Sequence, residues 1–276
     1  MSFHKVSRNG WLVFGLLVLG SGIMLFPFVW MVLSSFKSAG DVYTYPPKWI
    51  PSQWNFSNYA AVFRMIPFLR YYFNSIYTSL AQTAIQIFLS ITAAYALTKL
   101  DFPGKNGLIN LIRSTMFVPL IVTLIPLYLM FSRLGLVDTY SGIILPQVFS
   151  AFTTFLLMSF FVMVPNDLCD SAKLDGCGYY RIMTKVVVPN STASIGTATM
   201  FSFLAHWKSY TWPLIITNKA IYRTLPIGLK YLVQESSSEY QVMMAASVMA
   251  IVPVLIIFIF SERQLVRSVT LTGLKS

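Results

Sequence analysis

The residues that could carry out catalysis or bind a metal are few in this sequence. Its 276 residues contain two histidines, His4 and His206, and two cysteines, Cys169 and Cys177, which share one polar segment. The cysteines form no Cys-x-x-Cys pair and have no histidine nearby, so we expect free thiols and no metal site. The patterns His-Glu-x-x-His and Gly-x-Ser-x-Gly are also absent. We therefore predict no catalytic residues and no cofactor in this chain, and the alternative of a membrane enzyme is disfavoured.

The nearest match to a phosphate-binding loop is incomplete. Such a loop needs Gly, four residues, then Gly-Lys-Ser or Gly-Lys-Thr, because its backbone amides and lysine hold the phosphates. Here Gly104-Lys105 is followed by Asn106, and Lys99 stands in the place of the first glycine. The chain is therefore not expected to bind or hydrolyse ATP by itself.

The composition indicates that much of the chain faces lipid. Hydrophobic residues make up 56% and charged residues only 11%, with a mean hydropathy of +0.66, whereas a soluble domain carries about 25% charged residues. The net charge of +11 would suggest nucleic acid in a soluble protein. Here the basic residues stand singly between apolar runs, which is typical of residues that flank membrane spans. No nucleic-acid partner is predicted.

Six segments are long and apolar enough to cross about 30 Å of hydrocarbon. We expect helices, because a backbone in lipid must satisfy its own hydrogen bonds. The fifth segment is the most polar and contains His206 and Lys208, which suits a helix facing a protein interior or a pore. No acidic residue falls in any span, which disfavours an ion-coupled transporter or channel, the main alternative function. The spans are expected at about 11–33, 74–98, 114–132, 139–164, 192–217 and 242–260 of a single membrane domain, 1–276.

The polar connection between the fourth and fifth spans, residues 165–189, has the pattern of two short helices. Asn166 can cap a helix over residues 167–175, and Gly176 suits a left-handed turn at its end. A second helix is expected over residues 178–188, with Pro189 stopping it. One face of that second helix carries an apolar stripe made of Tyr179, Ile182, Met183 and Val186. The alternative is a loop that merely lies on the helix bundle.

This segment resembles the EAA loop of binding-protein-dependent ABC importer permeases. In that loop Glu-Ala-Ala is followed after three residues by Gly, and about a dozen residues later by Pro. The sequence here runs Asp170-Ser171-Ala172-Lys173-Leu174-Asp175-Gly176 and closes at Pro189. The departures are Asp170 for Glu, Ser171 for Ala, and Cys177 for the usual Ala after Gly. Asp170 keeps the charge on a side chain that is shorter by one methylene.

The resemblance extends over nearly the whole chain and is greatest to the carbohydrate branch of these permeases. Within that branch the chain is similar to the smaller inner-membrane subunit of maltose-type and glycerol-phosphate-type importers. The segments that carry this similarity are Ser35-Phe36-Lys37, Tyr45-Pro46-Pro47, Asn55 to Tyr59, Asn74-Ser75, Trp207, Trp212-Pro213-Leu214, Leu225 to Leu229, Arg263 to Arg267 and Gly273-Leu274-Lys275.

The resemblance implies an all-α integral membrane protein of the type I ABC importer fold, with six transmembrane helices. Residues 70–262 would be its core, and residues 165–189 a cytoplasmic helix-turn-helix coupling loop. The implied function is that of a permease for sugars or oligosaccharides, working by alternating access. The implied partners are a second homologous permease subunit, two ATPase subunits holding ATP and Mg, and an extracytoplasmic solute-binding protein that contacts residues 217–240. The residues expected to act in ATPase coupling are Asp170, Ser171, Ala172, Asp175, Gly176, Tyr179, Arg181 and Pro189.

Charge alone hardly orients the chain, because the 20 Lys and Arg residues divide almost evenly between the two sides of the membrane. The resemblance places the coupling loop, and with it both termini, in the cytoplasm of a bacterial cell, with the protein in the inner membrane.

Trp207, Lys208 and Tyr210 are the candidates for the substrate path. A lysine near a membrane is costly unless it snorkels, pairs or lines a wet cavity, and similar sugar permeases often carry Asn at this place. If Lys208 only snorkels to the surface, it has no role in transport. If it faces the path between two aromatic residues, an acidic sugar such as a uronate oligosaccharide would fit better than a neutral one.

Overall fold

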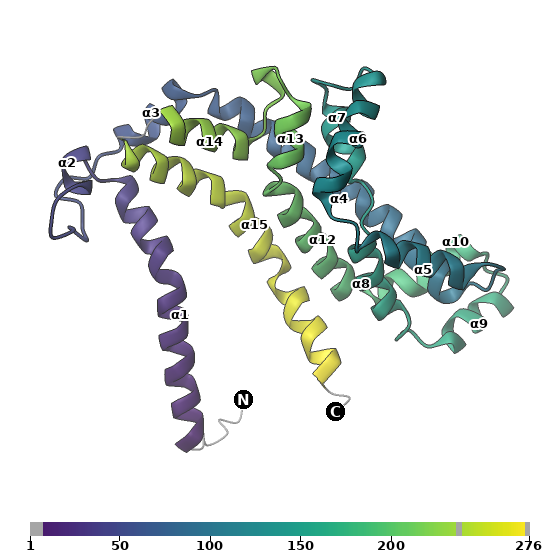
Figure 1. Cartoon of the computed structure of the whole chain (residues 1–276). Coiled ribbons are helices and arrows are strands. Elements are labelled where there is room, and N and C mark those ends of the chain that lie inside the picture. The colour runs from purple at the N-terminus through teal and green to yellow at the C-terminus, as the bar shows by residue number, and fades with distance from the viewer. Residues whose placement is uncertain (1–7, 236–238, 274–276) are drawn as a thin grey trace. The chain divides into compact units, whose positions relative to one another are not determined.

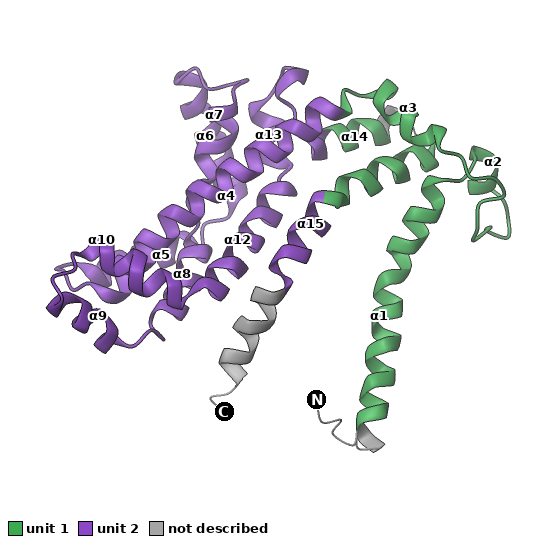
Figure 2. Cartoon of the chain, turned by 180° about the vertical axis from the view of Figure 1, so that it is seen from behind, with its two compact units in different colours: residues 1–68, 228–252 green, residues 69–227, 253–276 purple. Residues whose placement is uncertain are grey.

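The computed structural model describes residues 8–235 and 239–273 of the chain (Figure 1), and every regular element within them is helical. Leu274 and Lys275 of the C-terminal similarity segment, and residues 236–238 of the predicted binding-protein contact, lie outside these ranges. The described chain forms two compact units (Figure 2). Unit 1 comprises residues 1–68 and 228–252, and unit 2 comprises residues 69–227 and 253–276.

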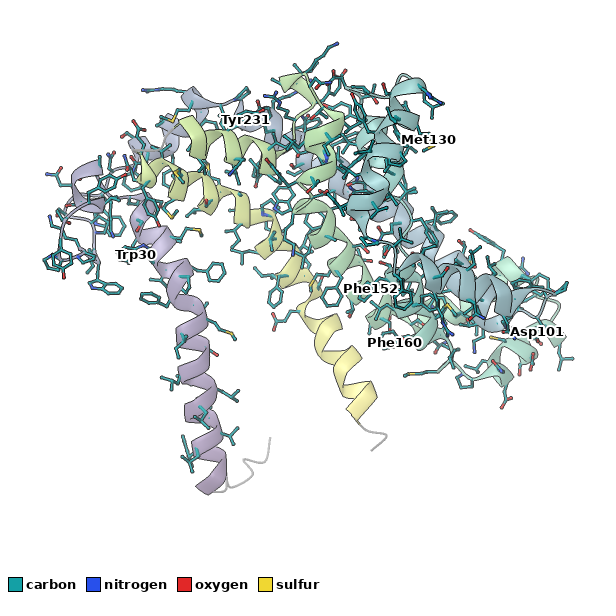
Figure 3. All side chains as sticks on the ribbon, viewed as in Figure 1. Trp30, Asp101, Met130, Phe152, Phe160 and Tyr231 are labelled. Atoms are coloured by element: carbon teal, nitrogen blue, oxygen red, sulfur yellow. The ribbon has the colours of Figure 1, made fainter. Side chains whose placement is uncertain are left out.

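Unit 1 includes α1 (Arg8–Ser35), whose side chains from Trp11 to Val32 are almost all apolar and largely exposed, as expected for a helix in lipid. Two short helices follow, α2 (Ala39–Val42) and α3 (Ser57–Met65). The amide of Asn58 donates to the carbonyl oxygens of Ser35 at 2.8 Å and Lys37 at 2.9 Å. The hydroxyls of Ser35 and Tyr59 are 2.8 Å apart. These bonds attach α3 to the end of α1, close to Trp30 (Figure 3).

Unit 2 is a helix bundle. In Figures 1 and 2, α9 and α10 lie at one end of it, and α7 and α13 lie at the opposite end. The helices α14 (Leu225–Glu235) and α15 (Tyr240–Gly273) continue from one unit into the other. The remaining elements are α4 (Phe68–Lys99), α5 (Lys105–Thr115), α6 (Leu120–Arg133), α7 (Tyr140–Ile144), η1 (Leu145–Gln147), α8 (Ala151–Phe161), α9 (Asn166–Leu174), α10 (Tyr179–Ile182), η2 (Met183–Val187), α11 (Val188–Asn190), α12 (Thr192–Trp207), α13 (Thr211–Ile216) and η3 (Ala220–Tyr222).

A buried polar stripe on α4 holds unit 2 together. It repeats every four residues, so its members share one face of the helix, and it consists of Asn74, Thr78, Gln82, Gln86 and Ser90. Asn74 donates to the carbonyl oxygens of Ile221 and Arg223, each at 2.8 Å. Gln82 donates to the carbonyl oxygen of Ile143 at 2.9 Å. In lipid such polar contacts bind helices together, because burial of apolar surface gives no advantage there.

The structure corrects the predicted spans in their shape. Within residues 8–235 and 239–273, three helices are long and apolar enough to cross a membrane unbroken: residues 10–35 of α1, all of α4, and residues 240–262 of α15. The predicted span over 114–132 is not one continuous helix, because α5 and α6 meet at 98°. Pro119, the N-cap residue of α6, has no amide hydrogen and restricts the residue before it, which ends the preceding helix.

The predicted spans 139–164 and 192–217 are broken as well. The segment that contains α7 and η1 meets α8 at 46°. If this bent pair and the bent pair α5–α6 each count as one span, the described residues contain five spans. α12 has 16 residues, and Lys208, Ser209 and Tyr210 separate it from α13.

Candidate functional site

The first half of the coupling loop is a helix that ends in a glycine turn. α9 covers Asn166–Leu174, and Gly176 follows it with φ +77°. The amide of Cys177 donates to the carbonyl oxygen of Ala172 at 2.9 Å, and that of Gly176 to Lys173 at 3.0 Å. These two bonds form a Schellman motif, in which a left-handed residue closes the helix. The predicted left-handed turn is confirmed, whereas the predicted Asn166 cap is wrong, because Asn166 is already inside the helix.

The second half of the loop does not stop at Pro189. α10, the π-helical segment η2 and α11 follow one another without a break from Tyr179 to Asn190. In η2 the amide of Val188 donates to the carbonyl oxygen of Met183, five residues back. Such a widened turn accommodates a proline, which clashes with a regular helix and cannot donate. The predicted stop at Pro189 is therefore wrong.

The apolar underside of the loop is buried in unit 2. Ile182 and Met183 are 1% and 7% exposed, whereas Tyr179 is 64% exposed. The prediction of one stripe that includes Tyr179 is therefore wrong, because Tyr179 points away from the buried cluster. The residues that form this cluster are Ala94 and Tyr95 of α4, Leu157 and Phe161 of α8, Ala198 of α12, and Cys169, Ile182, Met183 and Val187 of the loop. The loop thus rests directly on three helices of the bundle.

The outward surface of the loop combines charges with exposed apolar groups. Asp170 and Lys173 form an ion pair at 2.8 Å, and this hydrogen bond raises the pKa of Lys173. Ser171, Asp175 and Arg181 are also exposed. The large apolar side chains on this surface are Leu168, Leu174, Tyr179 and Tyr180, of which Leu174 is 90% exposed. Large exposed apolar side chains that are flanked by charges are typical of an interaction surface.

Lys99, the last residue of α4, is bonded to the beginning of the loop. Its ammonium donates to the carbonyl oxygen of Val164 at 2.6 Å and to Oδ1 of Asn166 at 2.8 Å. The end of α4 and the start of α9 are therefore joined by two charge-assisted hydrogen bonds, which are stronger than neutral ones.

A cavity of about 460 Å³ lies farther along the same helices. It is lined by Gln86 of α4, Leu120 of α6, Pro146 and Gln147 of η1, Phe149 and Ser150 of the connection to α8, Phe152 and Thr153 of α8, and Phe201, Ser202, Ala205 and His206 of α12. Its lining thus combines uncharged hydrogen-bonding groups with phenylalanine rings. No aspartate, glutamate, lysine or arginine of the described chain lines it.

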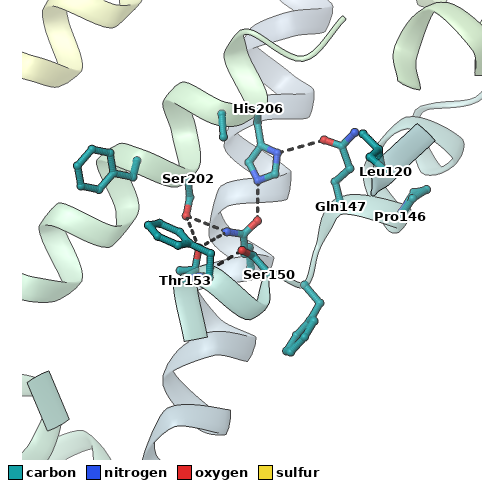
Figure 4. A pocket seen from close by; sticks show the side chains of 12 residues that line it. Leu120, Pro146, Gln147, Ser150, Thr153, Ser202 and His206 are labelled. Atoms are coloured by element: carbon teal, nitrogen blue, oxygen red, sulfur yellow. Dashed lines mark hydrogen bonds between the residues drawn. The ribbon is translucent and has the colours of Figure 1, made fainter. Parts of the chain in front are cut away.

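The polar side chains of this cavity form one hydrogen-bonded network (Figure 4). The amide of Gln86 donates to Thr153 Oγ1 at 2.8 Å and to Ser202 Oγ at 2.9 Å. Its oxygen lies 2.8 Å from Nε2 of His206, whose Nδ1 is 3.4 Å from Oε1 of Gln147. Three helices, α4, α8 and α12, therefore meet through side chains that can also bond to a polar ligand.

The three predicted substrate-path residues follow His206 in the sequence, and none of them lines this cavity. Trp207 is buried, with its ring stacked on Phe203 at 5.8 Å and edge-on to Tyr72 at 5.8 Å between centroids. Lys208 is exposed just beyond α12, and Tyr210 is half-buried. Sequence reasoning missed Gln86, although the four-residue repeat of polar residues on α4 is visible in the sequence.

A comparison with protein families matches residues 86–271 to the family described as "Binding-protein-dependent transport system inner membrane component". The matched segment includes the cavity and the coupling loop. The chain belongs to this family. It is therefore a multi-pass protein of the inner membrane, and the predicted resemblance to these permeases is confirmed.

Similar proteins cover nearly the full length of the chain. The arabinooligosaccharides transport system permease protein AraQ of Bacillus subtilis is 32% identical over 92% of this chain and 91% of its own. The sn-glycerol-3-phosphate transport system permease protein UgpE of Agrobacterium fabrum is 31% identical over 93% and 94%. The sulfoquinovosyl glycerol transport system permease protein SmoH of the same organism is 32% identical over 91% and 89%.

Among solved structures, the chain is similar to one from a bacterial ABC transporter involved in the import of the acidic polysaccharide alginate. The TM-score is 0.81 at 22% sequence identity, covering 95% of this chain and 99% of the other. The predicted fold class, an all-helical type I ABC importer permease, is confirmed.

Proposed function

We propose that this chain forms one membrane half of an ATP-driven importer for sugars or oligosaccharides, with the cavity around Gln86 as its part of the substrate path. One observation carries the proposal: the cavity and the buried underside of the coupling loop share the same three helices, α4, α8 and α12. A movement of the loop therefore acts on the helices that line the cavity. Similar proteins transport arabinooligosaccharides, glycerol 3-phosphate and sulfoquinovosyl glycerol.

The chemistry of the cavity suits polyhydroxylated ligands. Hydroxyl and amide groups can donate to and accept from sugar hydroxyls, and the phenylalanine rings Phe149, Phe152 and Phe201 provide apolar surface for the faces of a sugar ring. Ligand sites commonly combine such apolar walls with a few convergent polar groups. Gln86 lies about 20 Å along α4 from Lys99 at 1.5 Å per residue, so α4 connects the site to the coupling loop.

The ATPase is expected in a separate subunit, where ATP and Mg would be bound. The exposed face of the coupling loop, with Leu174, Tyr179 and Tyr180, would occupy a cleft in that subunit, and Asp170, Asp175 and Arg181 would make polar contacts at its rim. The Schellman turn at Gly176 would hold the two helical halves in a docked shape. Alternating access would follow as closure of two ATPase subunits pushes the loop against α4, α8 and α12.

Further partners follow from the same proposal. A second homologous permease subunit would complete the path, and a solute-binding protein would deliver the sugar. Since the loop is cytoplasmic in this proposal, the opposite end of unit 2, which carries residues 217–227, faces outward and is the expected contact of the binding protein. Both termini would be cytoplasmic.

An isosteric pair of variants tests the cavity. Thr153 lines the cavity, whereas its neighbour Thr154 is buried outside it and donates to the carbonyl oxygen of Ser150 at 2.9 Å and to the Ser90 hydroxyl at 3.3 Å. Each can be changed to Val, which removes a hydroxyl with little change of shape. Thr153→Val should lower the rate of ATP-dependent sugar uptake into proteoliposomes about fivefold. This factor corresponds to the loss of one hydrogen bond of about 1 kcal/mol. Thr154→Val should leave the rate unchanged.

Equal uptake by the two variants would exclude the cavity as the path. Ionophores would be added in a second arm of the assay. Uptake that requires ATP and persists with ionophores supports an importer driven by ATP, whereas loss of uptake with ionophores would establish ion coupling instead.

An acidic sugar is a second candidate substrate, and it rests on Lys208. This lysine is exposed, and no Asp or Glu of the described residues forms an ion pair with it. Lys208→Asn should weaken uptake of a uronate oligosaccharide and leave uptake of a neutral one unchanged. Equal uptake of both by wild type and variant would mean that Lys208 only snorkels.

A further inference from the structure

A second cavity, in unit 1, contains a buried cation. It measures about 270 Å³ and is lined by Trp30, Ser34, Lys37, Val42, Tyr43 and Tyr240. Lys37 is only 1% exposed, and its Nζ lies 3.7 Å from the centroid of the Trp30 ring. The hydroxyl of Ser34, also 1% exposed, has no hydrogen-bond partner among the residues that the structure describes. A buried hydroxyl without a partner is costly, and it is usually satisfied by water or a ligand.

The charge of Lys37 is not balanced by an ion pair within the described chain. The nearest candidate is Asp41, but its oxygens accept from the Lys48 ammonium at 2.8 Å and from the amide and hydroxyl of Ser52, each at 2.9 Å. Asp41 therefore forms its salt bridge with Lys48. The Asp41 carboxylate is therefore engaged by Lys48 and Ser52 and forms no ion pair with Lys37. Burying a cation without a paired anion is unfavourable, so the cavity is suited to an anion.

The position of the cavity indicates which anion is available. The apolar stretch of α1 that is long enough to span a membrane ends at Ser35, so we expect Ser34 and Lys37 at the depth where headgroups begin. Trp49 packs edge-on against Trp30 at 5.3 Å and against Phe26 at 5.5 Å between centroids. Tryptophan clusters of this kind are typical of a membrane interface. The apolar side chains of α1 are exposed along its length, so acyl chains can lie beside the helix directly below the cavity.

We propose that this cavity binds the phosphate group of an anionic phospholipid, with the ammonium of Lys37 and the hydroxyl of Ser34 as its ligands. The lipid would lie in the leaflet at the C-terminal end of α1, with an acyl chain along that helix. The cavity volume is about nine times the 30 Å³ that one water molecule occupies, which is sufficient for a phosphate and part of its glycerol. The bound lipid would satisfy the Ser34 hydroxyl and balance Lys37.

Native mass spectrometry of the purified transporter complex tests the site. The complex would be titrated with phosphatidylglycerol, with zwitterionic phosphatidylcholine and, in a separate arm, with inorganic phosphate. We expect phosphatidylglycerol to bind to wild type in preference to phosphatidylcholine. Lys37→Met should weaken its binding about tenfold, and Ser34→Ala about fivefold, as expected for hydrogen bonds to a charged and a neutral donor. Arg64→Gln, which removes an exposed charge of the same unit outside the cavity, should leave binding unchanged.

Ser34→Ala keeps the test decisive if Lys37→Met fails to assemble. Because the Ser34 hydroxyl has no partner within the described part of the chain, its removal should not destabilise the protein, so reduced lipid binding reports the ligand alone. Equal binding of phosphatidylglycerol by wild type and Ser34→Ala would overturn the proposal. Displacement of the lipid by inorganic phosphate at equal concentration would show a free-anion site. A cross-link from position 34 to an acidic residue of another subunit would assign the cavity to a protein partner.

Discussion

Gly176→Ala is expected to weaken coupling to the ATPase without affecting the insertion of the chain. Gly176 has φ +77°, and a Cβ added there would meet no atom within 4 Å. The cost therefore comes from the backbone alone, about 1–2 kcal/mol for a non-glycine residue in this region. A β-branched valine costs more, because it is a strong outlier at positive φ. Asparagine costs less, because it tolerates the left-handed region.

This cost can be converted into a measurable effect. If docking requires the Schellman turn, a loss of 1–2 kcal/mol lowers the affinity for the ATPase subunit about five- to thirtyfold. We expect the order Gly, Asn, Ala, Val for both ATPase binding in detergent and uptake in proteoliposomes, with Val nearly inactive. The amount of permease in the membrane should be equal for all four, since the turn is exposed and contributes little to the bundle.

Gly178 provides the matched control. It lies two residues farther along the same exposed turn, a Cβ added to it also meets no atom within 4 Å, and its φ is −74°. Gly178→Ala should therefore bind the ATPase like wild type. Normal uptake by Gly176→Val, or an equal loss in Gly176→Ala and Gly178→Ala, would refute the argument from backbone conformation.

Three further predictions concern other parts of the chain. Lys99→Met removes the two hydrogen bonds to the start of α9, which together contribute about 1–3 kcal/mol in this partly exposed position. Sugar uptake should therefore fall while ATP hydrolysis by the complex persists. An equal loss of uptake and of ATP hydrolysis would contradict this prediction. Gly142→Ala places a Cβ on the carbonyl oxygen of Leu136 and should destabilise the protein by about 1–3 kcal/mol, seen as a lower thermal unfolding temperature. Lys48 and Ser52 lower the pKa of Asp41 to about 2 from 3.8, so the stability that Asp41 contributes is complete above pH 3.8 and is lost as pH falls towards 2. Thermal unfolding in that range should show a smaller pH dependence in Asp41→Asn.

Much of the fold follows from the composition and the local patterns of the sequence. The apolar runs predict the membrane helices, and Gly176 predicts the turn of the coupling loop, because both depend on short stretches of chain. The positions of the breaks do not follow from the sequence, because the same residue type precedes a new helix at Pro119 and lies inside a continuous helical run at Pro189. What differs is the π-helical turn before Pro189, which depends on packing against the bundle.

The candidate cavity was also missed for a tertiary reason. His206, Trp207 and Lys208 are consecutive, and successive residues of a helix point about 100° apart, so neighbours in sequence face different surroundings. Only His206 lines the cavity. The packing of α12 against α4 and α8 determines which face of α12 meets Gln86. The sequence of α12 alone does not contain this information. The polar repeat on α4 was the visible indication.

The polar stripe of α4 also bears on how readily the bundle can move. A hydrogen bond between membrane helices contributes about 0.6 kcal/mol on average, and hydroxyl groups rotate to suit new neighbours. The amide of Gln86 has two hydroxyl acceptors at 2.8 and 2.9 Å. When α4 shifts against α8 or α12, such groups can exchange partners one at a time, so the helices can slide along a series of states of similar energy. Interlocked apolar side chains would have to separate together, and that would make the same displacement slow.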